Sequence, residues 1–287
     1  MSVRKVPDAE GCTLTLLEVD GLMFPTFPAD VIRGVPDLKL RDDDILISGY
    51  PKSGTHWLFE VLRVLLIGSC NDGQIEKDDF MIEMVPQNEL AKKPSPRILN
   101  THVRFSSLPR EIQQGKTKII YLLRNPKDSS VSFYNHHRKL EEYYNYHGKF
   151  KDYLPLWVDG KVDYGSWFDY VRSWHEGLRS HPDIPSLSVV YEDMKEDSLS
   201  QIQRISNFLG LSHDDAFLRK VDDWCSFKRM RERKGKYDLT PEGQPIMYRK
   251  GEVGDWKNWF TVADNEWFDQ VYREKMTGID LSFRYTI

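Results

Sequence analysis

Short runs of apolar residues alternate along the chain with longer stretches in which apolar residues recur every three or four positions. The first pattern is typical of buried strands and the second of one face of a helix. Strands are predicted over residues 45–47, 97–101, 118–123 and 186–191, and helices over 57–66, 127–140 and 197–208. This alternation predicts an α/β fold with a mostly parallel sheet flanked by crossover helices.

Two stretches carry no clear period. Residues 150–165 are rich in aromatic side chains, and residues 226–254 are polar, basic and interrupted by glycine. The second stretch is predicted to be a long functional loop. Since no repeat or Pro/Gly/Ser-rich linker divides the chain, we predict a single domain over residues 1–287.

Composition narrows the function. The chain has 40 Lys and Arg against 44 Asp and Glu, a formal net charge of −4. This argues against a general nucleic-acid binder, which needs a basic footprint. Three widely spaced cysteines, without metal-ligand spacing, predict a reducing compartment and no disulfide framework; they are Cys12, Cys70 and Cys225. No signal peptide and no membrane span is apparent, so we expect a cytoplasmic protein.

The loop at residues 50–55 is suited to an anion. A loop that ends at a helix N-terminus presents unpaired N–H groups and the positive end of the helix dipole. Gly54 permits close backbone approach, Lys52 adds a positive charge, and Ser53 and Thr55 add hydroxyl donors. It is not a Walker A loop, because the lysine precedes the glycine. An ordinary turn before a helix is the alternative.

Two other positions point to chemistry. Arg124 follows a predicted strand and can bind a phosphate with two N–H groups, and Ser132 lies about two helical turns further on. His102 ends another predicted strand, and a neutral imidazole is a suitable general base near pH 7. The alternatives are a surface arginine with a solvated serine, and a histidine packed at a strand end.

At these motifs the chain resembles the cytosolic sulfotransferases. Tyr50-Pro51-Lys52-Ser53-Gly54-Thr55 resembles their 5′-phosphosulfate loop, residues 124–132 their 3′-phosphate signature, and Arg249-Lys250-Gly251 the element that closes over that phosphate. The resemblance implies a P-loop-kinase-like core and the donor 3′-phosphoadenosine 5′-phosphosulfate (PAPS), with no metal. It also implies that residues 226–255 cover the donor and residues 1–40 help to line the acceptor pocket.

The resemblance implies a role for each matched position. Lys52 would stabilise the leaving group, Arg124 and Ser132 would hold the 3′-phosphate, and Trp57 would pack near the adenine. His56 and Cys225 depart from the threonines usual in the family. The implied donor-binding residues are Lys52, Ser53, Gly54, Thr55, His56, Trp57, Arg124, Ser132, Tyr191, Cys225, Phe227, Arg249, Lys250 and Gly251.

The segment Leu99-Asn100-Thr101-His102 resembles the one that bears the family's catalytic histidine. It implies that His102 is the general base, assisted by Lys52 and Ser132 as the other catalytic residues. His56 is a weaker rival, because a base must reach the acceptor. Some members carry a lysine where this chain has Asn100. The acceptor is expected to be a small, largely hydrophobic alcohol, phenol or amine, held by Phe27, Gln87, His102, Phe133 and Tyr248.

Residues 257–266 fit the pattern K-x-x-x-T-V-x-x-x-E, which in the family pairs two subunits. The resemblance implies a homodimer through Lys257, Thr261, Val262 and Glu266. The same residues also read as a helix start, with Thr261 and Asp264 in a capping box. Both interpretations can hold together.

The sequence therefore predicts in-line transfer of a sulfuryl group from PAPS. Two alternatives stay open. A nucleotide kinase would need a Walker A loop and a metal site. A non-catalytic relative would bind PAPS or its product PAP, 3′,5′-phosphoadenosine, without turnover.

Overall fold

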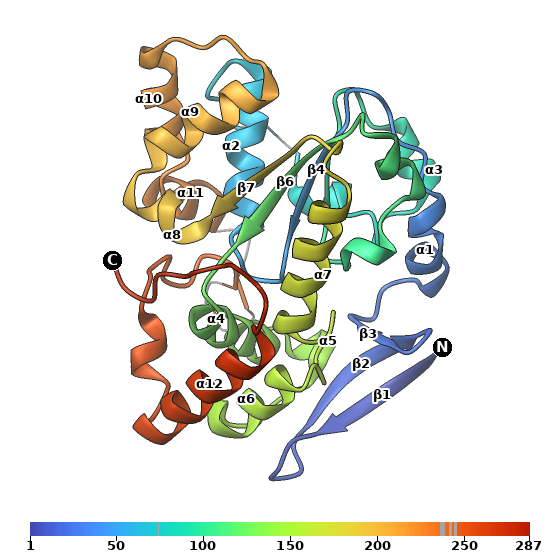
Figure 1. The fold of residues 1–287 in the computed structure, drawn as a ribbon, viewed down its shortest axis with the longest axis vertical. Coiled ribbons are helices and arrows are strands. Elements are labelled where there is room, and N and C mark those ends of the chain that lie inside the picture. Colours follow the sequence, from blue (N-terminus) through green and yellow to red (C-terminus); the bar gives the residue numbers. More distant parts are fainter. Residues whose placement is uncertain (74, 236–238, 241–242, 244–245) are drawn as a thin grey trace.

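A four-stranded parallel sheet forms the centre of the computed structural model, which describes residues 1–287 except 74, 236–238, 241–242 and 244–245 (Figure 1). Its strand order is β5-β4-β6-β7. All neighbouring strands are parallel, so their carboxyl ends meet at one edge. The four predicted strands and the α/β fold class are confirmed; the strands are β4 (Ile45–Gly49), β5 (Ile98–Thr101), β6 (Lys118–Leu123) and β7 (Ser186–Val190).

Both faces of this sheet are buried. Along β4, Ile45 and Ile47 pack into one apolar cluster and Leu46 into the other. On β6, Ile120 and Leu122 pack into one cluster, whereas Ile119, Tyr121 and Leu123 pack into the other. Strands buried on both sides read as continuous apolar runs, which is why the sequence marked them clearly.

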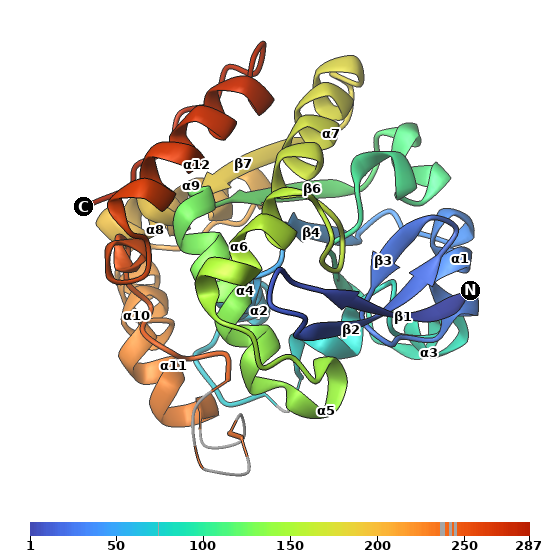
Figure 2. The same ribbon diagram turned by 90° about the horizontal axis from the view of Figure 1, so that it is seen from below.

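Helices cover both faces of the parallel sheet (Figures 1 and 2). One face carries α2 (Thr55–Ile67), α9 (Ser198–Leu209) and α10 (Asp215–Trp224). The other carries α4 (Pro126–Lys139), α6 (Phe150–Val158), α7 (Trp167–Ser180) and α12 (Val262–Lys275). Gly210 ends α9 in the left-handed conformation, which glycine adopts readily. Shorter helices are α1 (Ala29–Gly34), α3 (Gln87–Lys92), α5 (Glu141–Tyr144), α8 (Tyr191–Glu196) and α11 (Phe227–Lys234).

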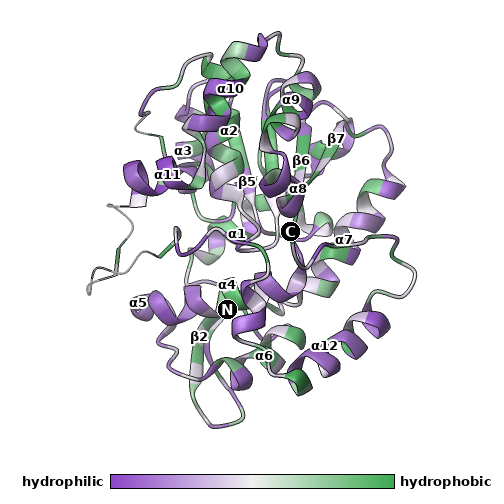
Figure 3. Cartoon of the chain, turned by 90° about the vertical axis from the view of Figure 1, so that its left-hand side faces the viewer, coloured by the Kyte–Doolittle hydropathy of each residue, from purple (hydrophilic) through white to green (hydrophobic). Residues whose placement is uncertain are grey.

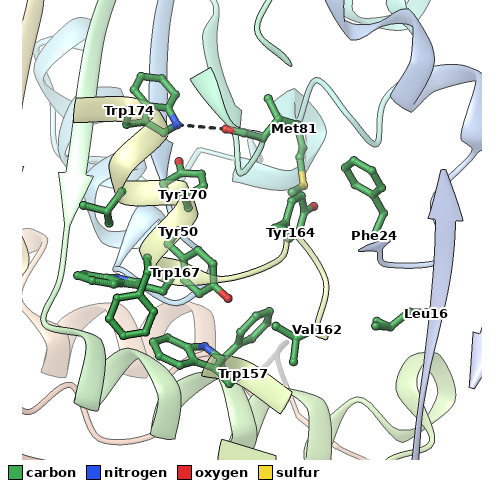
Figure 4. Packing of buried hydrophobic residues seen from close by; sticks show 14 of the residues in the cluster. Leu16, Phe24, Tyr50, Met81, Trp157, Val162, Tyr164, Trp167, Tyr170 and Trp174 are labelled. Carbon is green, nitrogen blue, oxygen red and sulfur yellow. Dashed lines mark hydrogen bonds between the residues drawn. The ribbon is translucent and has the colours of Figure 1, made fainter. Parts of the chain in front are cut away.

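An antiparallel sheet at the N-terminus was not predicted. It consists of β1 (Ser2–Pro7), β2 (Thr13–Val19) and β3 (Leu22–Phe24). A two-residue turn at Asp20-Gly21, both with positive φ, joins β2 and β3. An Asp-Gly pair between apolar runs is a hairpin signal that was present in the sequence. Leu16 and Phe24 face Val162 and Tyr164 across the core (Figure 4).

Two helices correct the sequence interpretation. Residues 150–158 form α6, whose side chains are buried on nearly every side, so no polar face marks its period. Residues 227–234, expected to belong to a loop, form α11, where Met230 is the buried residue and Ser226 caps the first turn. Figure 3 shows α11 as largely hydrophilic, in contrast to β6. Among the described helices, none has the length and apolar character to cross a membrane.

Candidate active site

A cavity of about 380 Å³ opens at the carboxyl edge of the parallel sheet. Its walls include Lys52 and Gly54 after β4, His102 after β5, Arg124 after β6 and Tyr191 after β7. The carboxyl edge of a parallel sheet is the usual place for ligands in α/β folds. Four loops that are distant in sequence therefore meet in one site.

The loop between β4 and α2 has a strained backbone. Lys52 has φ 69° and Gly54 φ 104°, and Gly54 precedes the first residue of α2. A Cβ atom on Gly54 would lie 2.7 Å from Cδ2 of Tyr191. The Oγ of Ser53 is buried and has no hydrogen-bond partner in the described part of the chain. A glycine pressed against its neighbour and an unsatisfied buried hydroxyl both suit a loop built to contact a ligand.

Arg124 connects the loop at residues 50–55 to an aromatic wall of the cavity formed by Tyr191 and Trp57. Its Nη1 donates a hydrogen bond to the Lys52 carbonyl oxygen at 2.8 Å, and its guanidinium lies 4.3 Å from the centre of the Tyr191 ring. Its Nε is buried without an acceptor among the described residues. Tyr191 in turn packs edge-to-face on Trp57, with ring centres 5.8 Å apart. A cation and two aromatic faces thus stand side by side.

The segment around residues 249–251 folds over α11. Gly251 has φ 68°, and a Cβ there would lie 2.3 Å from the Phe227 ring, so this contact requires glycine. Arg249 and Lys250 both pair with Asp255, at 2.7 and 2.5 Å. Burial opposes ionisation of Asp255, but hydrogen bonds from Lys250, Asn258 and Arg249 outweigh it and lower its pKa to about 2. Two cations are thereby held at the cavity wall.

Asp128 fastens this segment to α4. Its carboxylate accepts hydrogen bonds from the backbone N–H of Gly254 at 2.7 Å and of Trp256 at 2.9 Å. The position of the 249–251 cations therefore depends on α4, the same helix that carries Ser132.

His102 lies at the end of β5 with its ring fixed. Its Nδ1 is 2.6 Å from the Gly49 carbonyl oxygen, and its backbone N–H donates to Glu83 at 2.8 Å. Because a carbonyl oxygen only accepts, Nδ1 carries the proton and Nε2 keeps its lone pair. Burial, followed by the charge of Lys77, lowers the pKa of His102 to about 3. The ring is therefore neutral at physiological pH.

Two further histidines, His136 and His56, line the cavity near Lys52 and Lys77. Lys52 Nζ lies 3.4 Å from Nδ1 of His136 and donates to the Met247 sulfur at 2.9 Å. Burial and then Lys52 lower the pKa of His136 well below its usual value. Burial and then Lys77 lower the pKa of His56 to about 3. The cavity thus favours neutral imidazoles beside fixed cations.

The structure brings most of the predicted site residues together. The cavity lining includes Phe27, Lys52, Gly54, Thr55, His56, Trp57, His102, Arg124, Ser132, Phe133, Tyr191, Phe227, Tyr248, Arg249, Lys250 and Gly251. Residues 1–40 contribute Pro25 and Phe27. Residues 226–255 contribute several members of the list.

Three predicted residues lie outside this lining. Ser53, in the loop itself, is buried and is not part of the cavity lining. The Cys225 side chain packs in the apolar cluster between α2, α10 and α11, where burial raises its pKa. Gln87 turns away to donate to the Gly34 carbonyl oxygen at 2.5 Å. Cys225 therefore contributes to core packing and Gln87 to a hydrogen bond with the backbone, and neither side chain lines the cavity.

Sequence reasoning missed several lining residues. Lys77, Asp78, Met81, Asp163 and Tyr164 all face the cavity. They come from irregular segments and short helices, far in sequence from the recognised motifs. No local spacing could have placed them there.

The 257–266 segment starts α12. Thr261 caps the helix, and its capping box with Asp264 is confirmed. Val262 is 76% exposed, and Lys257 and Glu266 are also exposed.

Comparisons with known proteins agree with this site. The sequence model of the Sulfotransferase domain matches residues 42–280. The chain is 37% identical to mouse Sulfotransferase 1A1 over 95% of this chain and 98% of that protein, and 39% identical to mouse Sulfotransferase 1B1 over 87% and 88%. A crystal structure of a mouse sulfotransferase complexed with PAP superposes with a TM-score of 0.78 at 32% identity, covering 92% of this chain and 95% of that chain. A retinol dehydratase structure shares the fold, with a TM-score of 0.78 at 21% identity over 95% and 92%. The chain belongs to the sulfotransferase family of enzymes.

Proposed function

We propose that this enzyme transfers the sulfuryl group of PAPS to a hydroxyl or amine of a small, largely hydrophobic acceptor. The observation that carries the proposal is that Lys52, Arg124 and His102 meet in one cavity. Cations suited to phosphates lie beside a neutral histidine suited to a proton. The related mouse structure, which contains PAP, supports the choice of donor.

The donor would lie along the Lys52–Arg124 side. Lys52 and the first N–H groups of α2 would receive the 5′ end. Arg124, Ser132, Arg249 and Lys250 would hold the 3′-phosphate, with the N–H of Gly251 beside them. Trp57, Tyr191 and Phe227 provide aromatic faces for the adenine.

The proposed reaction is an in-line displacement. The acceptor oxygen attacks sulfur as its proton passes to Nε2 of His102, and the sulfur–oxygen bond to the 5′-phosphate breaks. The electron pair leaves on the phosphate oxygen, where Lys52 stabilises the charge. His102 is suited to the base role because its other nitrogen is fixed on Gly49. A metal-independent reaction is expected, and chelation with EDTA should leave the rate unchanged.

Aromatic and thioether side chains support an apolar acceptor. Phe27, Met81, Phe133, Tyr144 and Tyr164 face the cavity. Pockets of this kind bind flat or apolar molecules and orient them through few polar groups.

We also propose a homodimer in the cytoplasm. An exposed valine at a helix start, flanked by exposed Lys257 and Glu266, suits a small two-fold interface. Free cysteines at all three positions support a reducing compartment. Light scattering of wild type and Val262→Glu tests the dimer: a monomeric variant and a dimeric wild type are expected, and a monomeric wild type contradicts the proposal.

The main test is sulfuryl transfer from labelled PAPS to an acceptor panel by wild type and His102→Ala, with PAP binding followed by calorimetry. We expect wild type to be active and the variant to bind PAP normally but lose about 10³-fold in kcat. Inactivity of both proteins with PAP bound would favour a non-catalytic relative. Failure to bind PAP would remove the donor assignment.

A further inference from the structure

Asn100 holds a lysine from another segment. The Nζ of Lys77 donates to Oδ1 of Asn100 at 2.9 Å, and Nδ2 of Asn100 donates back to the Lys77 carbonyl oxygen at 2.6 Å. The Ile82 N–H also donates to the Asn100 carbonyl oxygen at 3.1 Å. The segment 77–82 is therefore tied to β5 two residues before His102, at the position where some relatives carry a lysine.

Lys77 is buried and lines the cavity. Its side chain is 2% exposed, and its Nζ lies 2.8 Å from Oδ1 of the half-exposed Asp78. An ammonium group has three N–H donors, and these two contacts use two of them. A buried lysine is costly unless its charge is paired, and here Asp78 pairs with it. The position of Lys77 in the cavity wall leaves its third N–H for a bound ligand.

The charge of Lys77 acts on both imidazoles at this end of the cavity. Burial is the largest cause of the lowered pKa of His56 and of His102, and the charge of Lys77 is the second. The effect of Lys77 on both pKa values is larger than the opposite effect of Asp78. Lys52 acts in the same direction, and His136 is the third imidazole in the wall. Glu83, whose pKa burial raises, accepts the His102 backbone N–H. Tyr164, whose pKa burial raises well above its usual value, packs edge-to-face on the His102 ring with ring centres 5.3 Å apart.

We propose that Lys77 is a catalytic residue of the transfer, supplying from the 77–82 segment the cation that relatives with a lysine at position 100 carry on the strand. Its third N–H contacts the acceptor or sulfuryl oxygen and stabilises the negative charge there as the oxygen–sulfur bond forms. Lys77 keeps its proton throughout; the acceptor proton still goes to His102, and the leaving electron pair to the phosphate oxygen. This inference rests on the proposed function.

Lys77→Gln is the primary test, because glutamine keeps a donor for Asn100 and removes the charge. We expect kcat for sulfuryl transfer to fall about 100-fold, while KM for PAPS, PAP affinity and the melting temperature change little. Lys92→Met is the matched control, since Lys92 is an exposed lysine paired with Glu89 outside the cavity. Its kcat should equal that of wild type.

Moving the cation back to the strand gives a sharper result. The kcat of the double variant Lys77→Gln/Asn100→Lys should be at least about tenfold higher than that of Lys77→Gln, because the lysine at position 100 restores a positive charge. Lys77→Arg keeps the charge and should fold even if Lys77→Gln does not. A folded Lys77→Arg with kcat within about tenfold of wild type supports the proposal, and a loss as large as that expected for Lys77→Gln overturns it.

The pH dependence of kcat distinguishes a catalytic role of Lys77 from a purely structural one. Wild-type kcat should stay flat from neutral pH down to pH 5, since His102 remains neutral there. In Lys77→Gln the acidic fall in kcat should move to higher pH, because a repelling charge has been removed. An unmoved profile together with wild-type kcat overturns the role of Lys77 alone. A wild-type enzyme that transfers no sulfuryl group overturns the proposed function instead.

Discussion

The side of the cavity proposed to bind the donor and the side proposed to bind the acceptor are assembled differently. The donor side is made by loops that directly follow β4, β6 and β7, together with the 249–251 segment fastened to α4. The acceptor side takes Phe27 from the N-terminal region, Lys77 from a 3-10 turn at Lys77–Phe80, and Tyr144 and Tyr164 from separate segments. The proposed donor side is therefore built from segments next to the sheet strands, whereas the proposed acceptor side depends on long-range packing.

The largest effect is expected at Lys52. Lys52→Met should lower kcat about 10³-fold with a smaller loss of PAP affinity, because the lysine acts mainly on the charge that develops at the leaving oxygen. Steady-state kinetics and PAP calorimetry measure the two effects. Equal losses of kcat and PAP affinity would show that Lys52 binds without favouring the transition state.

Gly54→Ala should damage the donor side alone. Its Cβ would enter the Tyr191 ring, and the strained backbone costs roughly 1–3 kcal/mol, so PAP affinity should fall about 30-fold. Gly68→Ala is the matched control, since Gly68 ends the same helix with φ 72° and no atom of the described residues lies within 4 Å of its Cβ position. The control should lose stability but bind PAP as wild type does. Equal PAP affinity in both variants would refute the close contact.

Acid should destabilise the acceptor side through its neutral histidines. His102 has a folded-state pKa of about 3 against an ordinary value of 6.5, so its stabilising effect is complete above pH 6.5 and is lost as pH falls from 6.5 towards 3. Between pH 7 and 5, urea unfolding of wild type should lose roughly 1–2 kcal/mol more than that of His102→Gln. The same loss in both proteins would contradict the depressed pKa.

The smallest effect is expected at Phe27. Phe27→Ala should raise KM for an apolar acceptor about fivefold and leave PAP affinity unchanged, because a single apolar wall contributes modestly to binding. Phe105→Ala provides a control, since Phe105 packs on Trp174 outside the cavity. A change in PAP affinity with Phe27→Ala would mean that the two sides are not independent.

The sequence predicted those strands, helices and loops that are determined by a local pattern of residues. The β4 and β6 runs, the helix after each of them, and the loops at Lys52 and Arg124 follow from continuous apolar stretches and short motifs. It could not predict α6, which is buried on nearly all sides, or the polar α11. Lys77 and His136 join the site only through tertiary packing, and Gln87 leaves it because its amide finds a backbone partner on α1.

Gly54 packs so closely on Tyr191 that a Cβ atom at position 54 would lie 2.7 Å from the ring, and this contact restricts the substitutions that both positions tolerate. A larger residue at position 54, or a ring displaced at position 191, would strike the other partner. A change in the loop at residues 50–55 therefore has to be matched by a change at position 191. Redesign towards a donor with a different base would have to leave this pair intact and vary the opposite wall at Phe227, whose own freedom is limited by Gly251.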